Sequence, residues 1–215
     1  MLNSENKVKL VRSLIAQIKY FLETKTTTIE QKEIFELISL IQLDENNINN
    51  QKPKKPQKKE AILNALNSIK DSNLMQIREY ILLALNHLQW NVDAEEFYGK
   101  TSGIGKDYLT GNMNTELIGP KTGFFVSNQL RLGLFLLEPN IFYKDHMHAA
   151  PELYLNLTGG TQWRFEHTNW TEKSPGSIIY NPPFRTHAMK VGDIPFLSVW
   201  CWTHSFNSKC ILVPR

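Results

Sequence analysis

The stretch His-Met-His-Ala-Ala-Pro-Glu-Leu-Tyr, residues 146–154, decides how this chain of 215 residues is interpreted. Successive side chains of a β-strand point to opposite faces, so His146 and His148 project to the same side. Glu152 and Tyr154 share that parity, and they face the same way if the extended run continues through residues 149–151. Two imidazoles and one carboxylate leave coordination positions open around a divalent ion, which is typical of catalytic metal sites. His187 completes the set.

Turn residues stand at fixed distances around these ligands. Gly159 follows Glu152 after six residues, and Pro175-Gly176 precedes the short apolar run 177–180. Pro182-Pro183 then leads to His187. This order resembles the two motifs of the cupin superfamily.

The cupin resemblance implies a double-stranded β-helix, a jelly-roll barrel, with one metal ion held by His146, His148, Glu152 and His187. The first motif usually begins with glycine, and this chain has Asn140 there. Asparagine tolerates the left-handed backbone almost as well as glycine, so the departure weakens the match only slightly.

The periodicity of the second half of the chain agrees with a mainly β fold. From about Gly111, short β-type runs alternate with turn signals such as Pro139-Asn140 and Gly159-Gly160. Several short strands at this spacing predict a sandwich or barrel, a class that includes the jelly rolls. The expected strands are 123–127, 130–137, 153–157, 161–166, 177–180 and 196–202.

The first ninety residues are expected to be an α-helical N-terminal region. Apolar residues recur at three- and four-residue steps from Leu10 to Leu22 and from Ile34 to Ile41, the stripe of an amphipathic helix. A Lys/Pro-rich linker near 46–59 interrupts the pattern. We expect the helices to form a packing layer over the barrel or a homodimer contact, with the cupin barrel over 91–211. Residues 212–215 resemble a thrombin-site remnant of an expression tag and are left out of the expected fold.

The composition argues against nucleic acid and membranes as binding partners. The net charge of +3 is mild, and the lysine run of the linker lacks the interleaved aromatic residues of single-strand binders, so nucleic acid is not expected. The first 21 residues have no uninterrupted apolar core, so we expect no signal peptide, no membrane contact and a cytoplasmic location. Cys201 and Cys210 form no zinc-knuckle pattern.

Two tyrosines flank the ligands. Tyr154 lies two residues beyond Glu152, and Tyr143 lies three before His146. A nearby divalent cation favours the phenolate and lowers the tyrosine pKa from about 10 toward neutrality, which makes a phenol a competent general base.

With these tyrosines the chain resembles the cupin-type dimethylsulfoniopropionate (DMSP) lyases over roughly residues 111–206. The matching segments are Leu130–Pro139, Tyr143, His146, His148, Glu152, Tyr154, Leu155, Pro182-Pro183, His187–Met189 and Trp200–Trp202. The resemblance implies an iron, zinc or manganese ion and a sulfonium carboxylate substrate. It further implies that Tyr154 removes the α-proton, with Tyr143 assisting, so that dimethyl sulfide leaves and acrylate remains.

The sulfonium leaving group is a soft cation that binds aromatic faces. Trp163, Phe165, Trp200 and Trp202 alternate along the expected strands, and Trp163 and Trp202 are the chosen pocket candidates. Two alternatives stay open. The same ligands serve metal-dependent cupin oxygenases and isomerases that act on other small carboxylates, and a non-catalytic cupin would only bind a small molecule.

Overall fold

The computed structural model describes residues 4–94, 96–99, 102–166 and 168–214. The helices are α1 (Ser4–Lys25), α2 (Ile29–Leu40), α3 (Lys59–Ser68), α4 (Met75–Ala84) and α5 (Lys106–Gly111), with single turns of 3-10 helix at Glu45–Asn47 and Ser72–Leu74. The strands are β1 (Asn112–Gly119), β2 (Phe125–Val126), β3 (Arg131–Leu137), β4 (Phe142–Met147), β5 (Glu152–Asn156), β6 (Thr161–Phe165), β7 (Thr171–Lys173), β8 (Ile178–Asn181), β9 (His187–Val191), β10 (Phe196–Trp202) and β11 (Ile211–Leu212).

The strands form two sheets with jelly-roll connectivity. One sheet has the order β2-β1-β3-β10-β5-β8 and the other β11-β4-β9-β6-β7. From β3 to β10 the chain passes repeatedly from one sheet to the other, and only β6 and β7 are consecutive strands of one sheet. Two facing sheets of four strands each, β3-β10-β5-β8 and β4-β9-β6-β7, are the double-sheet jelly roll to which cupins belong. The predicted fold class is therefore confirmed.

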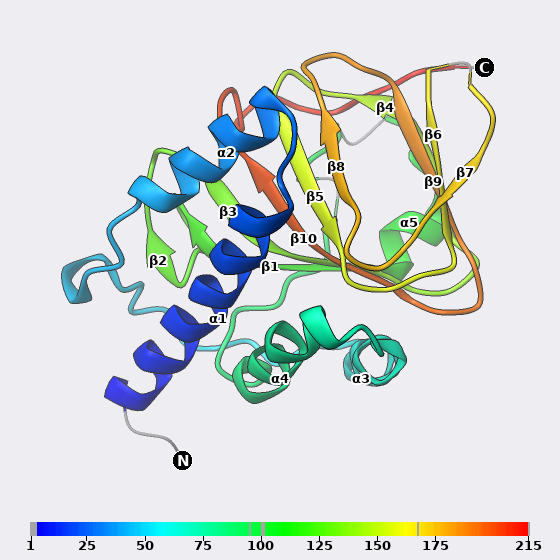
Figure 1. The fold of residues 1–215 in the computed structure, drawn as a ribbon. Coiled ribbons are helices and arrows are strands. Elements are labelled where there is room, and N and C mark those ends of the chain that lie inside the picture. The colour runs from blue at the N-terminus through cyan, green and yellow to red at the C-terminus, as the bar shows by residue number, and fades with distance from the viewer. Residues whose placement is uncertain (1–3, 95, 100–101, 167, 215) are drawn as a thin grey trace.

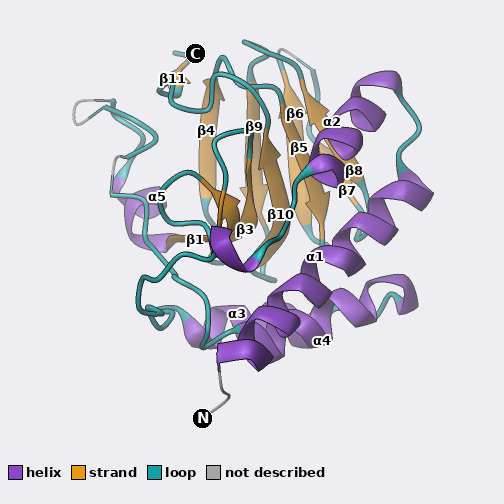
Figure 2. Ribbon diagram, turned by 90° about the vertical axis from the view of Figure 1, so that its left-hand side faces the viewer, coloured by secondary structure: helices purple, strands orange, loops and turns teal. Residues whose placement is uncertain are grey.

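The six-stranded sheet is buried on both faces. Along β10, Leu197, Val199 and Cys201 belong to the apolar cluster that includes the helices, whereas Trp200 and Trp202 belong to the cluster inside the barrel. Figures 1 and 2 show α1 and α2 lying across the outer face of this sheet and α3 and α4 beside its end. The helices therefore form a packing layer over the barrel.

The helices begin and pack where the apolar stripes predict. Val11, Leu14 and Ile18 of α1 are fully buried. Thr28 is the N-cap of α2, and it forms a capping box with Gln31 in which each side chain bonds the other residue's backbone N–H. Within the described residues, no helix is long and apolar enough to cross a membrane.

Two segments that the sequence places outside the regular fold form backbone hydrogen bonds with the rest of the protein. Inside the Lys/Pro-rich segment, the Lys54 N–H bonds the Leu88 carbonyl and the Lys54 carbonyl accepts from the Trp90 N–H. The exclusion of Leu212 from the fold was wrong, because β11 pairs with β4 and places Leu212 opposite His146. The open edge of β4 offers backbone groups that a short terminal segment can pair without any strong strand signal of its own. The tag origin of residues 212–215 stays a prediction.

Candidate metal centre

Four predicted ligands converge inside the barrel from both sheets. His146 on β4 lies opposite His187 on β9, and His148 follows β4 directly. One ring nitrogen from each of the three histidines lies within 4.8 Å of the others. Glu152, the first residue of β5, reaches in from the other sheet, and its Oε2 lies 3.2 Å from His148 Nε2 and 3.5 Å from His187 Nε2. All four side chains are buried.

The route by which Glu152 arrives differs from the expected one. The extended run does not continue through 149–151, because β4 ends at Met147 and β5 belongs to the opposite sheet. The chain crosses between the sheets over these residues, so Glu152 and Tyr154 face the histidines across the barrel. The prediction that Glu152 and Tyr154 face the histidines is therefore correct, but the continuous strand on which it was based does not exist.

Backbone carbonyls fix the orientation of every imidazole. The Nδ1 atoms of His146, His148 and His187 lie 2.8, 2.8 and 2.9 Å from the carbonyl oxygens of Lys144, Ala150 and Arg185. Since a carbonyl only accepts hydrogen bonds, each Nδ1 carries the hydrogen. In the neutral rings, Nε2 then keeps a lone pair, as a metal ligand requires.

The charges of this site are strongly coupled. Burial, together with its two histidine neighbours, holds the pKa of His146 well below its ordinary value, so this ring is neutral. Burial alone would lower the pKa of His148, but the Glu152 carboxylate outweighs it and raises that pKa. Burial likewise acts against ionised Glu152, but His148 and His187 hold its pKa well below the usual range.

The donor set fits one divalent metal ion. Three imidazoles and one carboxylate are ligands common to zinc, iron and manganese sites. His187 Nε2 is buried and has no hydrogen-bond partner, which leaves a costly orphan acceptor unless an ion binds it. These residues are the ones that would hold the metal.

Both predicted tyrosines line the same cavity as His146, His148 and Glu152. The Tyr143 ring stacks on His146 at 4.2 Å, and its hydroxyl accepts a 2.7 Å hydrogen bond from Tyr98. Burial raises the pKa of Tyr143, and burial together with Glu152 raises that of Tyr154, both well above the ordinary value. The lowering of the tyrosine pKa by a bound metal ion stays a prediction.

The two tryptophans have different positions. Trp202 lines the cavity, donates a 2.6 Å hydrogen bond from its indole to Glu152 Oε1, and lies 4.7 Å from the His148 ring. Trp163 is fully buried and does not line the cavity; its ring packs against Tyr154 at 5.2 Å. Trp200 lines the cavity instead.

The strand pattern left other parts of this site unrecognised. Asn181, at the end of β8, donates a 2.9 Å hydrogen bond to Glu152 Oε2. Phe97 and Tyr108, from the segment before the barrel, and Cys210, from the C-terminal segment, line the cavity as well. No spacing rule connects these segments to the ligands, because tertiary packing alone brings them there.

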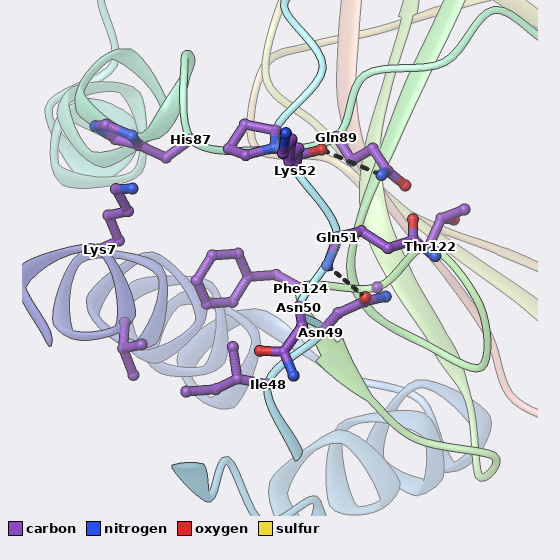
Figure 3. Close-up of a pocket in the computed structure, with 13 residues that line it drawn as sticks. Lys7, Ile48, Asn49, Asn50, Gln51, Lys52, His87, Gln89, Thr122 and Phe124 are labelled. Carbon is purple, nitrogen blue, oxygen red and sulfur yellow. Dashed lines mark hydrogen bonds between the residues drawn. The ribbon is translucent and has the colours of Figure 1, made fainter. Parts of the chain in front are cut away.

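A second cavity lies outside the barrel (Figure 3). It measures about 270 Å³ and lies among α1, residues 48–53 and the turn before β2, with Lys7, Lys52 and His87 in its wall. It shares no residue with the metal centre.

Comparison with known proteins gives consistent results. The family model of the dimethylsulfoniopropionate lyases matches residues 30–198. A curated relative, dimethylsulfoniopropionate lyase DddQ of Ruegeria pomeroyi strain ATCC 700808 / DSM 15171 / DSS-3, is 25% identical over 136 residues, which are 63% of this chain and 65% of that protein. The match thus spans slightly less than two thirds of the curated relative.

Two solved structures share the fold over nearly the whole chain. The crystal structure of the DMSP lyase DddQ from Ruegeria pomeroyi DSS-3 has a TM-score of 0.69 at 20% identity, covering 95% of this chain and 96% of that one. A structure from a report on the DMSP lyases RdDddP and RnDddQII has a TM-score of 0.71 at 17% identity, covering 97% and 100%. At these identities the likeness shows the fold.

Proposed function

The chain belongs to the dimethylsulfoniopropionate lyase family, and from this premise we propose that it is a metal-dependent carbon–sulfur lyase that cleaves DMSP into dimethyl sulfide and acrylate. The observation that carries the proposal is the single cavity that Tyr154 shares with His146, His148 and Glu152. A base and a metal centre that face one small cavity suit proton abstraction next to a carboxylate.

In the proposed reaction the phenolate of Tyr154, which a bound metal ion would favour over the phenol, takes the proton from the carbon α to the substrate carboxylate. The electrons of that C–H bond form the new C=C bond, and the C–S electron pair leaves with sulfur. A cationic sulfonium thereby becomes neutral dimethyl sulfide, acrylate remains, and the proton rests on the phenol. Tyr143, fixed by its hydrogen bond with Tyr98, assists or orients the substrate beside Tyr154.

The metal ligands of this proposal are His146, His148, Glu152 and His187. A bound iron, zinc or manganese ion would supply Lewis-acid stabilisation of the substrate carboxylate, which needs no redox change. Trp202 serves twice, as an aromatic face toward the sulfonium and as the indole donor that orients Glu152. Trp163 supports the Tyr154 ring from behind. A homodimer and a cytoplasmic location stay predictions.

The decisive experiment is headspace gas chromatography of DMSP incubated with the protein loaded separately with iron, manganese and zinc. Release of dimethyl sulfide with an equal amount of acrylate is expected for at least one metal. Absence of the gas for all three refutes the proposal. Oxygen uptake with another small carboxylate would then favour the oxygenase alternative, and saturable binding without turnover would favour a binding cupin.

A further inference from the structure

Polar side chains alternate along the inner face of β1. Asn114 pairs with Phe135 of β3, and directly paired residues of antiparallel strands share a face. Phe135 belongs to the apolar cluster inside the barrel, whereas Met113 belongs to the cluster that includes the helices. Asn114 therefore faces the interior. Asn112 and Glu116, two residues to either side, share that face because side chains of a strand alternate with period two.

Two of these three polar side chains are held by partners within the fold. The Asn112 amide accepts from the Asp93 N–H at 2.7 Å and donates to the carbonyls of Asp93 and Tyr108 at 3.1 and 2.8 Å. The Glu116 carboxylate is paired with Arg131. Both side chains are therefore satisfied, as is usual for buried polar groups.

Asn114 differs from both of its neighbours. It is only 7% exposed, and it lines the cavity that also contains His146, His148 and Glu152. Its backbone bonds that of Asn91, but among the described residues its side-chain amide has no hydrogen-bond partner. An unpaired amide in a buried place is unfavourable, so a ligand that enters the cavity gains affinity by pairing with it.

The position of Asn114 determines which end of a ligand it meets. In the sheet, β3 and β10 lie between β1, which carries Asn114, and β5, which carries Glu152. Asn114 therefore lies on the side of the cavity that is remote from Glu152. A small ligand whose carboxylate is held at the metal centre directs its β-substituent toward Asn114. This orientation of the ligand rests on the proposed function.

The chemistry of the amide determines which β-substituent it favours. The amide oxygen carries partial negative charge and only accepts hydrogen bonds. Its attraction for a positive charge is strong in a cavity wall from which water is largely excluded. A hydrocarbon substituent gives the amide no partner, and a site with a polar group left unpaired rejects such a ligand.

We infer that Asn114 is a specificity-determining residue whose amide oxygen recognises the positively charged β-substituent of a carboxylate ligand. For the proposed substrate this substituent is the sulfonium group. The inference assigns a ligand contact to β1, a strand that carries none of the metal ligands or proposed catalytic tyrosines, and it predicts a preference that binding alone can measure.

The test uses isothermal titration calorimetry on the metal-loaded protein with two ligands of the same shape. They are 3-(trimethylammonio)propionate, which carries the positive charge, and 4,4-dimethylpentanoate, which has a neutral tert-butyl group in its place. The charged ligand should bind roughly tenfold more tightly than its isostere. Equal affinity of the two ligands for the unaltered protein overturns the inference.

Asn114→Leu removes the amide and keeps its size, so it should reduce the preference severalfold while the isostere binds nearly as before. Asn91→Leu is the matched control, because Asn91 bonds the backbone of Asn114 but lies outside the cavity, and its preference should not change. Equal weakening of both ligands in Asn114→Leu would place the amide at the carboxylate end and refute the assignment. An unchanged preference in Asn114→Leu refutes it as well.

Thermal unfolding separates recognition from a structural role. Asn114→Leu loses no hydrogen bond within the described residues, so its Tm should be no lower than that of the unaltered protein. Asn112→Leu loses three hydrogen bonds, and its Tm should fall by several degrees. A similar fall in Asn114→Leu would show that the fold needs the amide, and it would contradict the inference. A preference that depends on Asn114 supports the inference even if no dimethyl sulfide is released, whereas release of the gas with an unchanged preference refutes only the role of Asn114.

Discussion

Tyr154→Phe removes one hydroxyl from the cavity. It therefore tests the proposed catalytic role of this hydroxyl separately from its contribution to stability. Tyr154 is 5% exposed and packs against Trp163 and Phe196, contacts that a phenylalanine ring retains. The structural loss is one hydrogen-bonding group, worth about 1 kcal/mol, which lowers Tm by roughly 2–4 °C in a protein of this size. Loss of a general base lowers kcat by roughly 10²–10⁴, equivalent to about 3–5 kcal/mol. The catalytic effect therefore exceeds the structural one severalfold.

Dimethyl sulfide release measured by headspace chromatography gives kcat, elemental analysis gives the metal content, and thermal unfolding gives Tm. The variant should keep its metal and fold while losing turnover. Tyr180→Phe is the control, because Tyr180 lies on β8 outside the cavity and should keep full activity. If Tyr154→Phe retains more than about a tenth of kcat with full metal, the phenol is not the base, since general bases contribute more than that.

Three further changes test other parts of the site. His148→Ala should lower the bound metal measured by elemental analysis, and unchanged occupancy would remove His148 from the ligand set. Asn181→Leu deletes the amide that holds Glu152 Oε2, and outer hydrogen bonds of this kind change metal affinity by about 10–100-fold; a metal-competition titration that finds no weakening would contradict this role. Burial raises the pKa of Asp93, so the folded protein binds the proton of this carboxyl group more tightly than the unfolded chain does. The contribution of Asp93 to stability is therefore complete below its unfolded pKa of about 4. It is lost as pH rises through the folded pKa. Asp93→Asn should remove this loss, so the difference in Tm between pH 4 and pH 7 should move in favour of pH 7; a difference that matches the unaltered protein would contradict the assignment.

The sequence predicted the strands whose apolar residues are contiguous and missed those built around polar side chains. β10 was expected over 196–202 and lies there, because both of its faces are buried against apolar layers. β1 is fully buried yet contains Asn112, Asn114 and Glu116, and it was not expected. Asn112 donates a hydrogen bond to the Asp93 carbonyl, and Glu116 forms an ion pair with Arg131. Single-sequence periodicity carries no trace of such partners.

The residues of the candidate site also fall into those that the sequence predicted and those that it missed. The sequence singled out the four candidate ligands and both tyrosines because their spacing resembles a family pattern, and the structure brings these residues together. The aromatic wall was found only in part, since Trp202 lines the cavity and Trp163 does not. β6 and β10 lie in different sheets, and the alternation of aromatic residues along each strand does not indicate which tryptophan reaches the cavity. Phe97 had no sequence signal at all, because no regular spacing relates the segment before the barrel to the strands.

Groups outside the family pattern orient the four buried side chains of the candidate metal centre. Each imidazole is oriented through Nδ1 by a carbonyl two residues away, and Glu152 is held by Trp202 and Asn181. Because these bonds hold the donor groups in place, the side chains lose little conformational freedom when an ion binds. The ligands come from two sheets, so their mutual distances depend on the packing of the whole barrel. A chain with the same four residues and a differently packed interior would keep the motif and lose the site.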